Sequence, residues 1–230
     1  MSNIAIITAR GGSKRIPKKN IKEFCGKPII AYSIEAAIES GIFDEVMVST
    51  DSEEIADIAR KYGASIPFMR SEKTSSDFAT TADVLNEVLD EYEKRGMYYD
   101  YFSCIYPTAP FVTAGKLLNA YNLLINTNAD KIEAVTRFSF PPQRGYIVCN
   151  GGIKYQFPEY KTTRSQDLEP IYHDCGQFYI YKTEVFKLRK IGSGITLPFI
   201  VSNLETQDID DMTDWELAEL KYNLFNRNER

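Results

Sequence analysis

Histidine and cysteine are scarce in this sequence, which has one histidine and four cysteines in 230 residues. The cysteines stand at positions 25, 104, 149 and 175, and no two of them have the C-x-x-C spacing of a metal or redox site. With a single histidine to complete a ligand set, a zinc site is not expected. Scattered cysteines without a pairing pattern favour reduced thiols in a cytoplasmic protein.

Net positive charge and long hydrophobic runs are also lacking. The chain has 27 lysines and arginines against 32 aspartates and glutamates, which gives a net charge of −5. This balance argues against nucleic-acid binding, which needs a basic face. No apolar run approaches the roughly 18 residues that span a bilayer, and the start, MSNIAIITARGG, lacks the flanks of a signal peptide. We therefore expect a cytoplasmic protein that binds neither nucleic acid nor membrane.

What the sequence does contain is an alternation of short apolar runs with helical patterns. Strands are expected at residues 4–8, 45–49, 65–69, 101–106 and 132–138, and helices at residues 29–40, 51–62, 82–94 and 114–127. Thr50 and Glu53 have the capping-box spacing for the second of these helices. The alternation predicts an α/β fold with a mostly parallel, doubly wound sheet.

The alternation of strands and helices ends after Phe140. The expected elements are a hairpin that turns at Asn150, Gly151 and Gly152, a strand at 176–181, a short helix at 183–190, a strand at 198–202 and a helix at 213–225. Thr213 and Glu216 have capping-box spacing for the last of these helices. We interpret the chain as one domain, residues 1–230, with a β-rich insertion at about 138–170.

Despite the acidic balance, basic residues crowd together just after the first strand, in the stretch IAIITARGGSKRIPKKN. They are Arg10, Lys14, Arg15, Lys18 and Lys19. Ligands of parallel sheets bind beyond the carboxyl ends of the strands. Gly11 and Gly12 allow a close approach to the backbone, and the cations suit phosphate. A solvated basic turn is the alternative, but the position favours a triphosphate site, although the Walker A and G-x-G-x-x-G patterns are both absent.

A second candidate site lies in the late segment TQDIDDMTDWE. Asp208 and Asp210 are separated by one residue, which in an extended segment puts both carboxylates on the same side. Two hard oxygen ligands suit Mg²⁺, which completes its shell with water and phosphate. The alternative is that these acids belong to the start of the last helix, where Asp211 or Thr213 can act as the cap.

Several segments in this order resemble the acylneuraminate cytidylyltransferases, which make CMP-activated sialic-type sugars. They are RGGSKRIPKKN, GKPIIAYSIEAA, VSTDSEEIADIARKYGA, YPTAP and the late DID. The resemblance implies a Rossmann-like nucleotidyltransferase core whose opening loop holds the phosphates of CTP. Carried over by position, the nucleotide ligands are Arg10, Gly11, Gly12, Ser13, Lys14, Lys19 and Asn20, with Arg10 and Lys19 the most important for catalysis. Asp208 and Asp210 then match the family's magnesium pair.

The resemblance also implies how the base is read. Arg70 matches a family arginine after the third strand, and either Thr80 or Thr81 matches a small hydroxyl residue further on. Asp77 and both threonines can instead simply begin the next helix. Asp51 ends the second strand on the ligand side, where it can face the ligand or cap a helix.

The sugar side looks most like the pseudaminic acid branch of the family, on the segments SKRIP, CIYPTAP, YKTTRSQDL and YHDCGQFY. Tyr106 stands where sialic acid enzymes commonly have glutamine. Arg164 is expected to bind the sugar carboxylate, and Gln177 and Tyr179 to face the sugar. His173, next to an aspartate, can be a general base or a structural hydrogen-bonding group, but we favour a role in sugar recognition.

The reaction implied is attack of the anomeric hydroxyl of a nine-carbon acidic sugar on the α-phosphorus of CTP, with pyrophosphate leaving. The acceptor expected is pseudaminic acid, with legionaminic or N-acetylneuraminic acid as alternatives. Other possibilities are a UTP- or GTP-dependent enzyme, or a nucleotide-binding regulator without catalysis. The insertion is rich in aromatic residues, and in the resembling family it exchanges arms across a two-fold axis, so a homodimer is implied.

Overall fold

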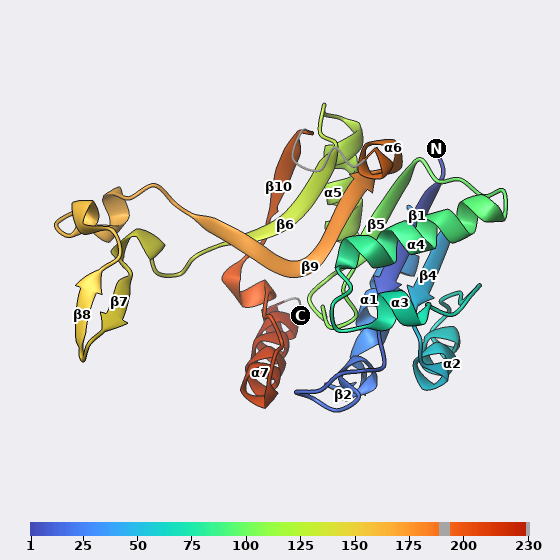
Figure 1. The fold of residues 1–230 in the computed structure, drawn as a ribbon, viewed down its shortest axis with the longest axis horizontal. Helices are drawn as coiled ribbons and strands as arrows, with labels where there is room; N and C mark the ends of the chain where they lie inside the picture. Colours follow the sequence, from blue (N-terminus) through green and yellow to red (C-terminus); the bar gives the residue numbers. More distant parts are fainter. Residues whose placement is uncertain (189–193, 229–230) are drawn as a thin grey trace.

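The computed structural model describes residues 1–188 and 194–228, with side chains described as far as residue 225. Within these residues, six strands form a central sheet in the order β10-β6-β9-β5-β1-β4 (Figure 1). They are β1 (Asn3–Thr8), β4 (Glu45–Ser49), β5 (Tyr101–Ile105), β6 (Lys131–Arg137), β9 (Tyr172–Lys182) and β10 (Thr196–Ile200). Strand β1 runs parallel to β4 and β5, and β6 to β10, while β9 is antiparallel to both its neighbours. The expected mostly parallel sheet is confirmed.

Helices cover both faces of this sheet. They are α1 (Ile29–Glu39), α2 (Glu53–Lys61), α3 (Glu72–Ser75), α4 (Thr81–Lys94), α5 (Ala114–Ile125) and α6 (Thr183–Lys187). One buried cluster joins α1, α2 and α5 to one face of the sheet through residues such as Ile34, Ile55 and Leu117. Another joins α4 and α6 to the opposite face through Leu85 and Phe186. This two-faced packing is the doubly wound arrangement that the sequence predicts.

A further apolar cluster lies at the end of the molecule where β1 runs out. It joins the short hairpin of β2 (Glu23–Phe24) and β3 (Lys27–Pro28) to α1 and α7 (Met212–Asn228). Phe24 is at its centre, with ring centroids 5.5 Å from Trp215 and 5.6 Å from Tyr32. Figure 1 shows β2 and α7, from opposite ends of the sequence, at this same end. The cluster therefore ties the opening loop to the late acidic segment.

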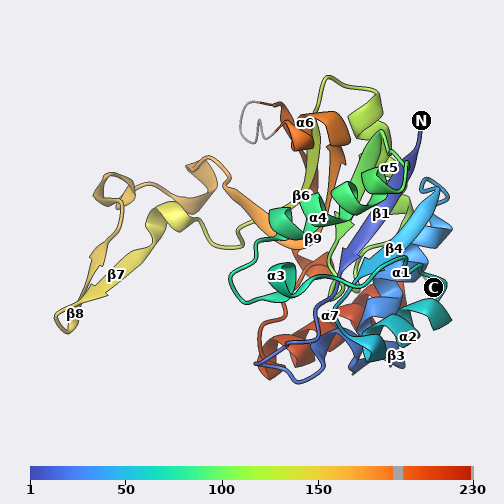
Figure 2. The same ribbon diagram turned by 45° about the vertical axis from the view of Figure 1, so that its right-hand side comes forward.

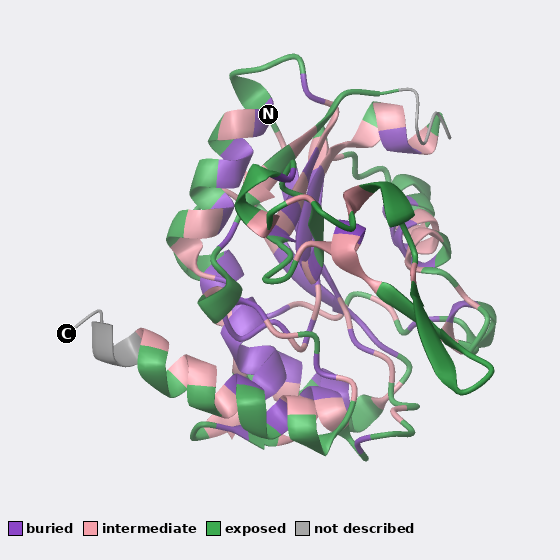
Figure 3. Ribbon diagram, turned by 90° about the vertical axis from the view of Figure 1, so that its left-hand side faces the viewer, coloured by how far each residue is buried: buried purple, intermediate pink, exposed green. Residues whose placement is uncertain are grey.

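The insertion, residues 138–170, is called the arm below. It leaves the sheet after β6 and stands clear of the body in Figure 1 and again in Figure 2. Its hairpin is built from β7 (Tyr146–Cys149) and β8 (Gly152–Tyr155), and Figure 3 shows it almost wholly exposed. Asn150 and Gly151 have φ of 49° and 76°, as a two-residue turn of type I′ requires. The predicted turn is confirmed, and the division into one domain with an insertion remains our interpretation.

Some expected elements differ from the observed ones. Residues 65–69 form no strand within the described chain beyond one bridge from Ser65 to Met47, because Pro67 has no N–H to continue a ladder. The cap of α2 is Ser52, whose hydroxyl accepts from the N–H of Ile55, and not Thr50.

Two differences concern the later part of the chain. Helix α7 is capped by Asp211, which accepts from the N–H groups of Thr213 and Asp214, so the capping box of Thr213 is wrong. The late strand lies two residues earlier than expected, at β10. Helix α6 ends at Lys187, and positions 189 and 190 of its expected range lie outside the described residues. Among the helices described, none has the length and apolarity to cross a bilayer.

Candidate active site

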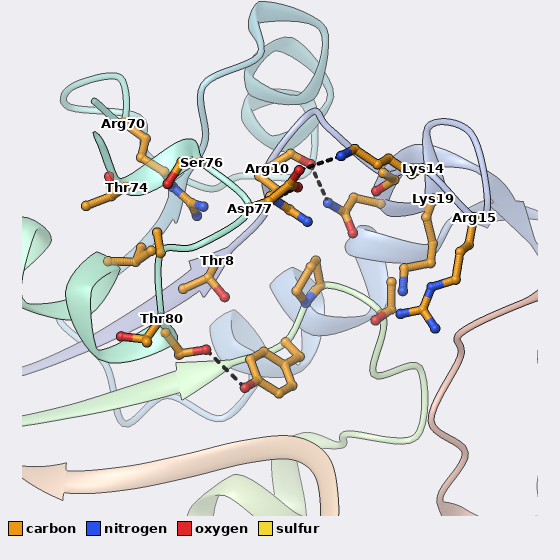
Figure 4. Close-up of a pocket in the computed structure, with 18 of the residues that line it drawn as sticks. Thr8, Arg10, Lys14, Arg15, Lys19, Arg70, Thr74, Ser76, Asp77 and Thr80 are labelled. Carbon is orange, nitrogen blue, oxygen red and sulfur yellow. Dashed lines mark hydrogen bonds and ion pairs between the residues drawn. The ribbon is translucent and has the colours of Figure 1, made fainter. Parts of the chain in front are cut away.

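A cavity of about 510 Å³ lies where β1 and β5 end, at the edge of the sheet expected to bind ligand. Its wall includes eleven residues that the sequence analysis singled out, several of which are labelled in Figure 4. They are Arg10, Ser13, Lys14, Arg15, Lys19, Asn20, Arg70, Thr80, Thr81, Tyr106 and Asp210. Segments from the start, middle and late part of the chain thus surround one space.

The first turn of the opening loop is fixed by its own hydrogen bonds. The side-chain amide of Asn20, which is buried, donates to the carbonyl of Arg10 at 2.9 Å. The N–H of Gly11 donates to the Asp51 carboxylate at 2.8 Å. A Cβ at Gly11 would lie 3.1 Å from Cβ of Ser52, so a larger residue would crowd this turn. Asp51 therefore holds the loop rather than capping α2, and neither Gly11 nor Gly12 is on the wall of the cavity.

The basic loop and the acidic segment converge because each carries one buried isoleucine. Ile16 and Ile209 are 2% and 1% exposed, and both belong to the cluster around Phe24. Arg15, next to Ile16, and the two aspartates that flank Ile209 are not buried with them. Nζ of Lys19 donates to the carbonyl of Ile209 at 2.7 Å.

A second contact across the same junction is an ion pair, with Nη2 of Arg15 lying 2.8 Å from Oδ1 of Asp210. Burial shifts the pKa values of two groups near this junction. Partial burial lowers the pKa of Lys19, although the carboxylates of Asp210 and Asp208 act in the opposite direction. Desolvation and the nearby Asp210 raise the pKa of Asp208. Arg15, Lys19 and Asp210 thus meet at this end of the cavity wall, whereas Asp208 lies close to Lys19 but is not on the wall.

The acidic pair fits a metal ion that takes its other ligands from a substrate. Asp208 and Asp210 flank the buried Ile209 and so carry two hard oxygen donors on the side away from the cluster. Among the described residues, no group of three or more histidine, cysteine, aspartate or glutamate side chains could hold a metal by itself. A pair of carboxylates supplemented by phosphate oxygens and water is a typical magnesium shell.

Arg70 forms the opposite part of the wall. It is 7% exposed, and its guanidinium donates from Nε to the hydroxyl of Ser49 at 3.0 Å and from Nη2 to the Ser49 carbonyl at 2.6 Å. Burial lowers the pKa of Arg70 to about 10, so the side chain stays charged at neutral pH. Thr80 caps α4 through a capping box with Asp83, which confirms the helix-start interpretation of this threonine.

Asp77 is a cavity residue that the sequence analysis considered only as a possible helix start. Its Oδ1 lies 2.8 Å from Nη1 of Arg10, and its Oδ2 accepts from Nζ of Lys14 (Figure 4). These hydrogen bonds, first from Lys14 and then from Arg10, lower the pKa of Asp77. The only sequence signal was an acid in a polar loop before α4, which points equally to a helix start.

A second cavity, of about 430 Å³, adjoins the first and shares Thr81 and Tyr106 with it. The hydroxyl oxygens of these two residues are 3.2 Å apart. Tyr179 is on the wall and donates to the Asp174 carboxylate. Burial, and next this hydrogen bond, raise the pKa of Tyr179, so it remains a neutral donor. Apolar groups of Leu85 and other residues complete this space.

Three residues expected near the sugar lie on neither cavity wall of this chain. Gln177 is 2% exposed and donates to the carbonyl of Glu205, because β9 is irregular where Gly176 has φ of 59°. His173 is exposed, with Nδ1 2.8 Å from the Asp174 carbonyl. Arg164 lies in the arm, 71% exposed, and pairs with Asp167 at 2.7 Å. The placement of Gln177 beside the sugar is thus not what the structure shows.

Comparison with known proteins gives concordant results. A family model described as "Cytidylyltransferase" matches residues 4–181. The chain is 42% identical over 229 residues to a pseudaminic acid cytidylyltransferase of Campylobacter jejuni subsp. jejuni serotype O:23/36 (strain 81-176), covering 96% of this chain and 97% of that protein. It is 34% identical over 230 residues to a CMP-N,N'-diacetyllegionaminic acid synthase of Legionella pneumophila subsp. pneumophila (strain Philadelphia 1), covering 95% of each.

Among solved structures, CMP:2-keto-3-deoxy-manno-octonic acid synthetase complexed with CTP superposes with a TM-score of 0.71. The match covers 99% of this chain and 100% of that one at 18% identity. At that identity the likeness concerns the fold alone. It agrees with the α/β architecture described above.

Proposed function

Because the chain belongs to the cytidylyltransferase family, we propose that it transfers CMP from CTP to the anomeric hydroxyl of pseudaminic acid, releasing pyrophosphate. The family predicted from the opening loop and the DID segment is confirmed by the family match and by the relative of 42% identity. The observation that carries the proposal is the pairing of Lys19 with Ile209 and of Arg15 with Asp210. Cations proposed to bind a triphosphate thus meet Asp210, a carboxylate proposed to bind its metal ion, on the wall of one cavity.

The nucleotide is proposed to lie across the first cavity. Arg10, Lys14 and Lys19 neutralise the phosphates, and Ser13 adds a hydroxyl donor. Arg70 and Thr80 lie on the side away from Lys19 in Figure 4 and are proposed to face the cytosine. Such a site accelerates the reaction mainly by holding the α-phosphorus in place and offsetting charge that develops as pyrophosphate leaves.

Asp208 and Asp210 are proposed to hold Mg²⁺ once the nucleotide is bound. The ion would offset charge on the phosphate oxygens and ease deprotonation of the attacking hydroxyl. No enzyme nucleophile is required, and the buried thiols are poorly suited to be one. Burial raises the pKa of Cys104 to about 12 and that of Cys175 to about 11, so neither forms a thiolate near neutral pH. The sugar hydroxyl therefore attacks directly.

The sugar is proposed to occupy the second cavity, with its anomeric carbon at the boundary formed by Thr81 and Tyr106. This arrangement places the hydroxyl beside the α-phosphate and the rest of the ring along Tyr179 and Asp174. The neutral hydroxyl of Tyr179, held by Asp174, presents a fixed polar edge to the sugar. Gln177 has no part in this proposal, since its side chain is buried elsewhere.

A homodimer is proposed because the arm leaves large apolar side chains uncovered. Val148 and Ile153 are 77% and 67% exposed, and a two-stranded hairpin cannot bury both its faces. Arg164 is carried on the same arm, beyond both cavities of its own chain. A two-fold partner would bring Arg164 to the other subunit's sugar site. The four free thiols support the proposed cytoplasmic location.

The test is a product assay with CTP, Mg²⁺ and each of three acceptors: pseudaminic, legionaminic and N-acetylneuraminic acid. The expected result is CMP-sugar and pyrophosphate, with the highest kcat/KM for pseudaminic acid. A higher value for either other sugar refutes the acceptor assignment but keeps the reaction. CTP binding without pyrophosphate release would instead indicate a regulator. Preference for UTP or GTP over CTP in competition would refute the nucleotide assignment.

A further inference from the structure

We propose that Asp77 is a specificity-determining residue that competes with phosphate groups for the cations of the opening loop and returns to them as pyrophosphate leaves. The inference rests on the proposed function in one respect, since it takes Arg10 and Lys14 as ligands of the triphosphate. It assigns to Asp77 control over which anions enter the cavity and how fast the inorganic product departs.

The first support is the geometry of the carboxylate. Oδ1 of Asp77 lies 2.8 Å from Nη1 of Arg10, and the other oxygen accepts from Nζ of Lys14. One planar anion therefore bridges a guanidinium and an ammonium, as two oxygens of a phosphate group would. Figure 4 shows Asp77 between these two side chains, inside the cavity. A phosphate and Asp77 cannot occupy this position together.

The second support is that the other cations of this loop that line the cavity have partners other than Asp77. Lys19 donates to the Ile209 carbonyl, and Arg15 pairs with Asp210. Arg10 and Lys14 are thus the cations that Asp77 withholds from a ligand. A triphosphate can pair with Arg10 and Lys14 only by displacing the carboxylate of Asp77.

The third support is that displacement is easy. The side chains of Arg10, Lys14 and Asp77 are 39%, 77% and 45% exposed, and ion pairs so open to water contribute little. Asp77 lies in the turn between α3 and α4, and the adjacent Phe78 is 94% exposed. No packed side chain at Phe78 resists movement of the turn. A polyanion can exchange with Asp77, whereas a weakly charged anion gains too little to do so.

The same competition acts after the chemical step. Pyrophosphate keeps the charges that bound Arg10 and Lys14 but loses the nucleoside contacts that held the rest of CTP in the cavity. Asp77 then re-forms two ion pairs at the site that pyrophosphate vacates. This exchange lowers the affinity for CTP and for pyrophosphate by a similar factor. Only CTP keeps the contacts on the Arg70 side, so pyrophosphate is the ligand that the exchange brings close to release.

The test compares Asp77→Asn with wild type and with Glu54→Gln as a matched control. Glu54 pairs with Lys18 at 2.7 Å in the same basic loop, but neither residue is on the cavity wall. Calorimetry measures binding of inorganic triphosphate, pyrophosphate and orthophosphate. We expect Asp77→Asn to bind triphosphate and pyrophosphate about fivefold more tightly, the scale expected for losing competing exposed ion pairs. Glu54→Gln should bind both as wild type does.

Kinetics add a readout that a merely structural role would not produce. Asp77→Asn should lower the KM for CTP and strengthen inhibition by pyrophosphate, while the sugar KM stays unchanged. Equal or weaker binding of triphosphate by Asp77→Asn than by wild type would overturn the inference. Wild-type turnover measured in the same preparations tests the proposed function separately, because triphosphate binding decides the role of Asp77 whichever sugar is the acceptor.

Discussion

The edge of the cavity and the arm use the same kinds of apolar residue with opposite results. At the cavity edge, Ile16 and Ile209 are 2% and 1% exposed, although they come from segments about 190 residues apart. In the arm, Val148 and Ile153 are close in sequence and remain 77% and 67% exposed. The first region is completed by its own chain. The second leaves these side chains uncovered by the described residues of its own chain.

The difference arises from the number of layers that each region can assemble. The cavity edge receives a helix, a hairpin and a loop, which together enclose the ring of Trp215. The arm has two strands, held by ladder bonds and by the Tyr146 and Tyr155 hydroxyls, 3.0 Å apart. Two strands leave one apolar face without a partner layer. The predictions that follow test this contrast, in order of decreasing expected effect on turnover.

Asp210→Asn should cause the largest loss. Replacing a carboxylate that pairs with Arg15 and is proposed to bind the metal should lower kcat/KM about 100-fold. Pyrophosphate release measures the loss, and thermal unfolding checks that the fold survives. A variant that unfolds at a much lower temperature would attribute the loss to folding and not to the metal site.

Val148→Glu combined with Ile153→Glu should abolish the proposed homodimer, in which a partner subunit covers the apolar face of the arm. Charges placed on an apolar face that a partner covers are costly to bury, so the protein should elute as a monomer. Because each monomer then lacks the partner's arm, kcat/KM for the sugar should fall about 50-fold, while the thermal midpoint changes little. Light scattering coupled to size exclusion measures the state. A dimer that persists would refute the arm as the interface.

Arg164→Ala should raise the sugar KM about 20-fold, since a charge-assisted pair with the sugar carboxylate is lost, and leave the CTP KM unchanged. Equal effects on both constants would contradict the placement of Arg164.

The same variant distinguishes action within a chain from action between chains. Arg164→Ala and Asp210→Asn subunits are mixed and allowed to exchange. If Arg164 acts on the partner's site, one of the two sites in each mixed dimer carries both native residues. Activity should recover to roughly a quarter of the wild-type value if Arg164 acts on the partner's site. Without recovery, Arg164 would belong to its own subunit.

Ile209→Ala should have the smallest effect on turnover and a clear effect on stability. Removing a fully buried isoleucine from the shared cluster should cost about 3 kcal/mol of unfolding free energy, measured with urea. Turnover should fall about fivefold, because the buried side chain that fixes the position of Asp208 and Asp210 is lost. Leu224→Ala is a suitable control, since Leu224 is 50% exposed on α7.

Much of the fold follows from local pattern and one rule of topology. The strand expected at 45–49 has those bounds in the structure, and the helix expected after Pro28 ends at Glu39. The rule that sites lie beyond the carboxyl ends of parallel strands gives the place of the basic loop, whereas its meeting with the acidic segment was expected only from the family resemblance. Which of these residues bind ligand remains a prediction.

What the sequence could not provide are pairings set by distances between remote side chains. The interaction of Asp77 with Arg10 depends on how the turn before α4 lies over the opening loop. The periodic spacing of apolar residues, which predicts helices and strands, carries no information about it. Gln177 was misplaced because strict alternation fails where β9 bends at Gly176. Asp51 was expected to face the ligand or cap a helix, but it holds the backbone of Gly11.

The hydrogen bond from Lys19 to the carbonyl of Ile209 has a consequence for biosynthesis. The residues it joins are about 190 positions apart, so at usual translation speeds roughly 10–40 s separate their emergence from the ribosome. During that interval the basic loop lacks Ile209, against which it packs, and the carboxylates of Asp208 and Asp210. A nascent chain therefore cannot complete the proposed CTP site. The site forms only after the acidic segment around Ile209 has been synthesised and has packed against the basic loop.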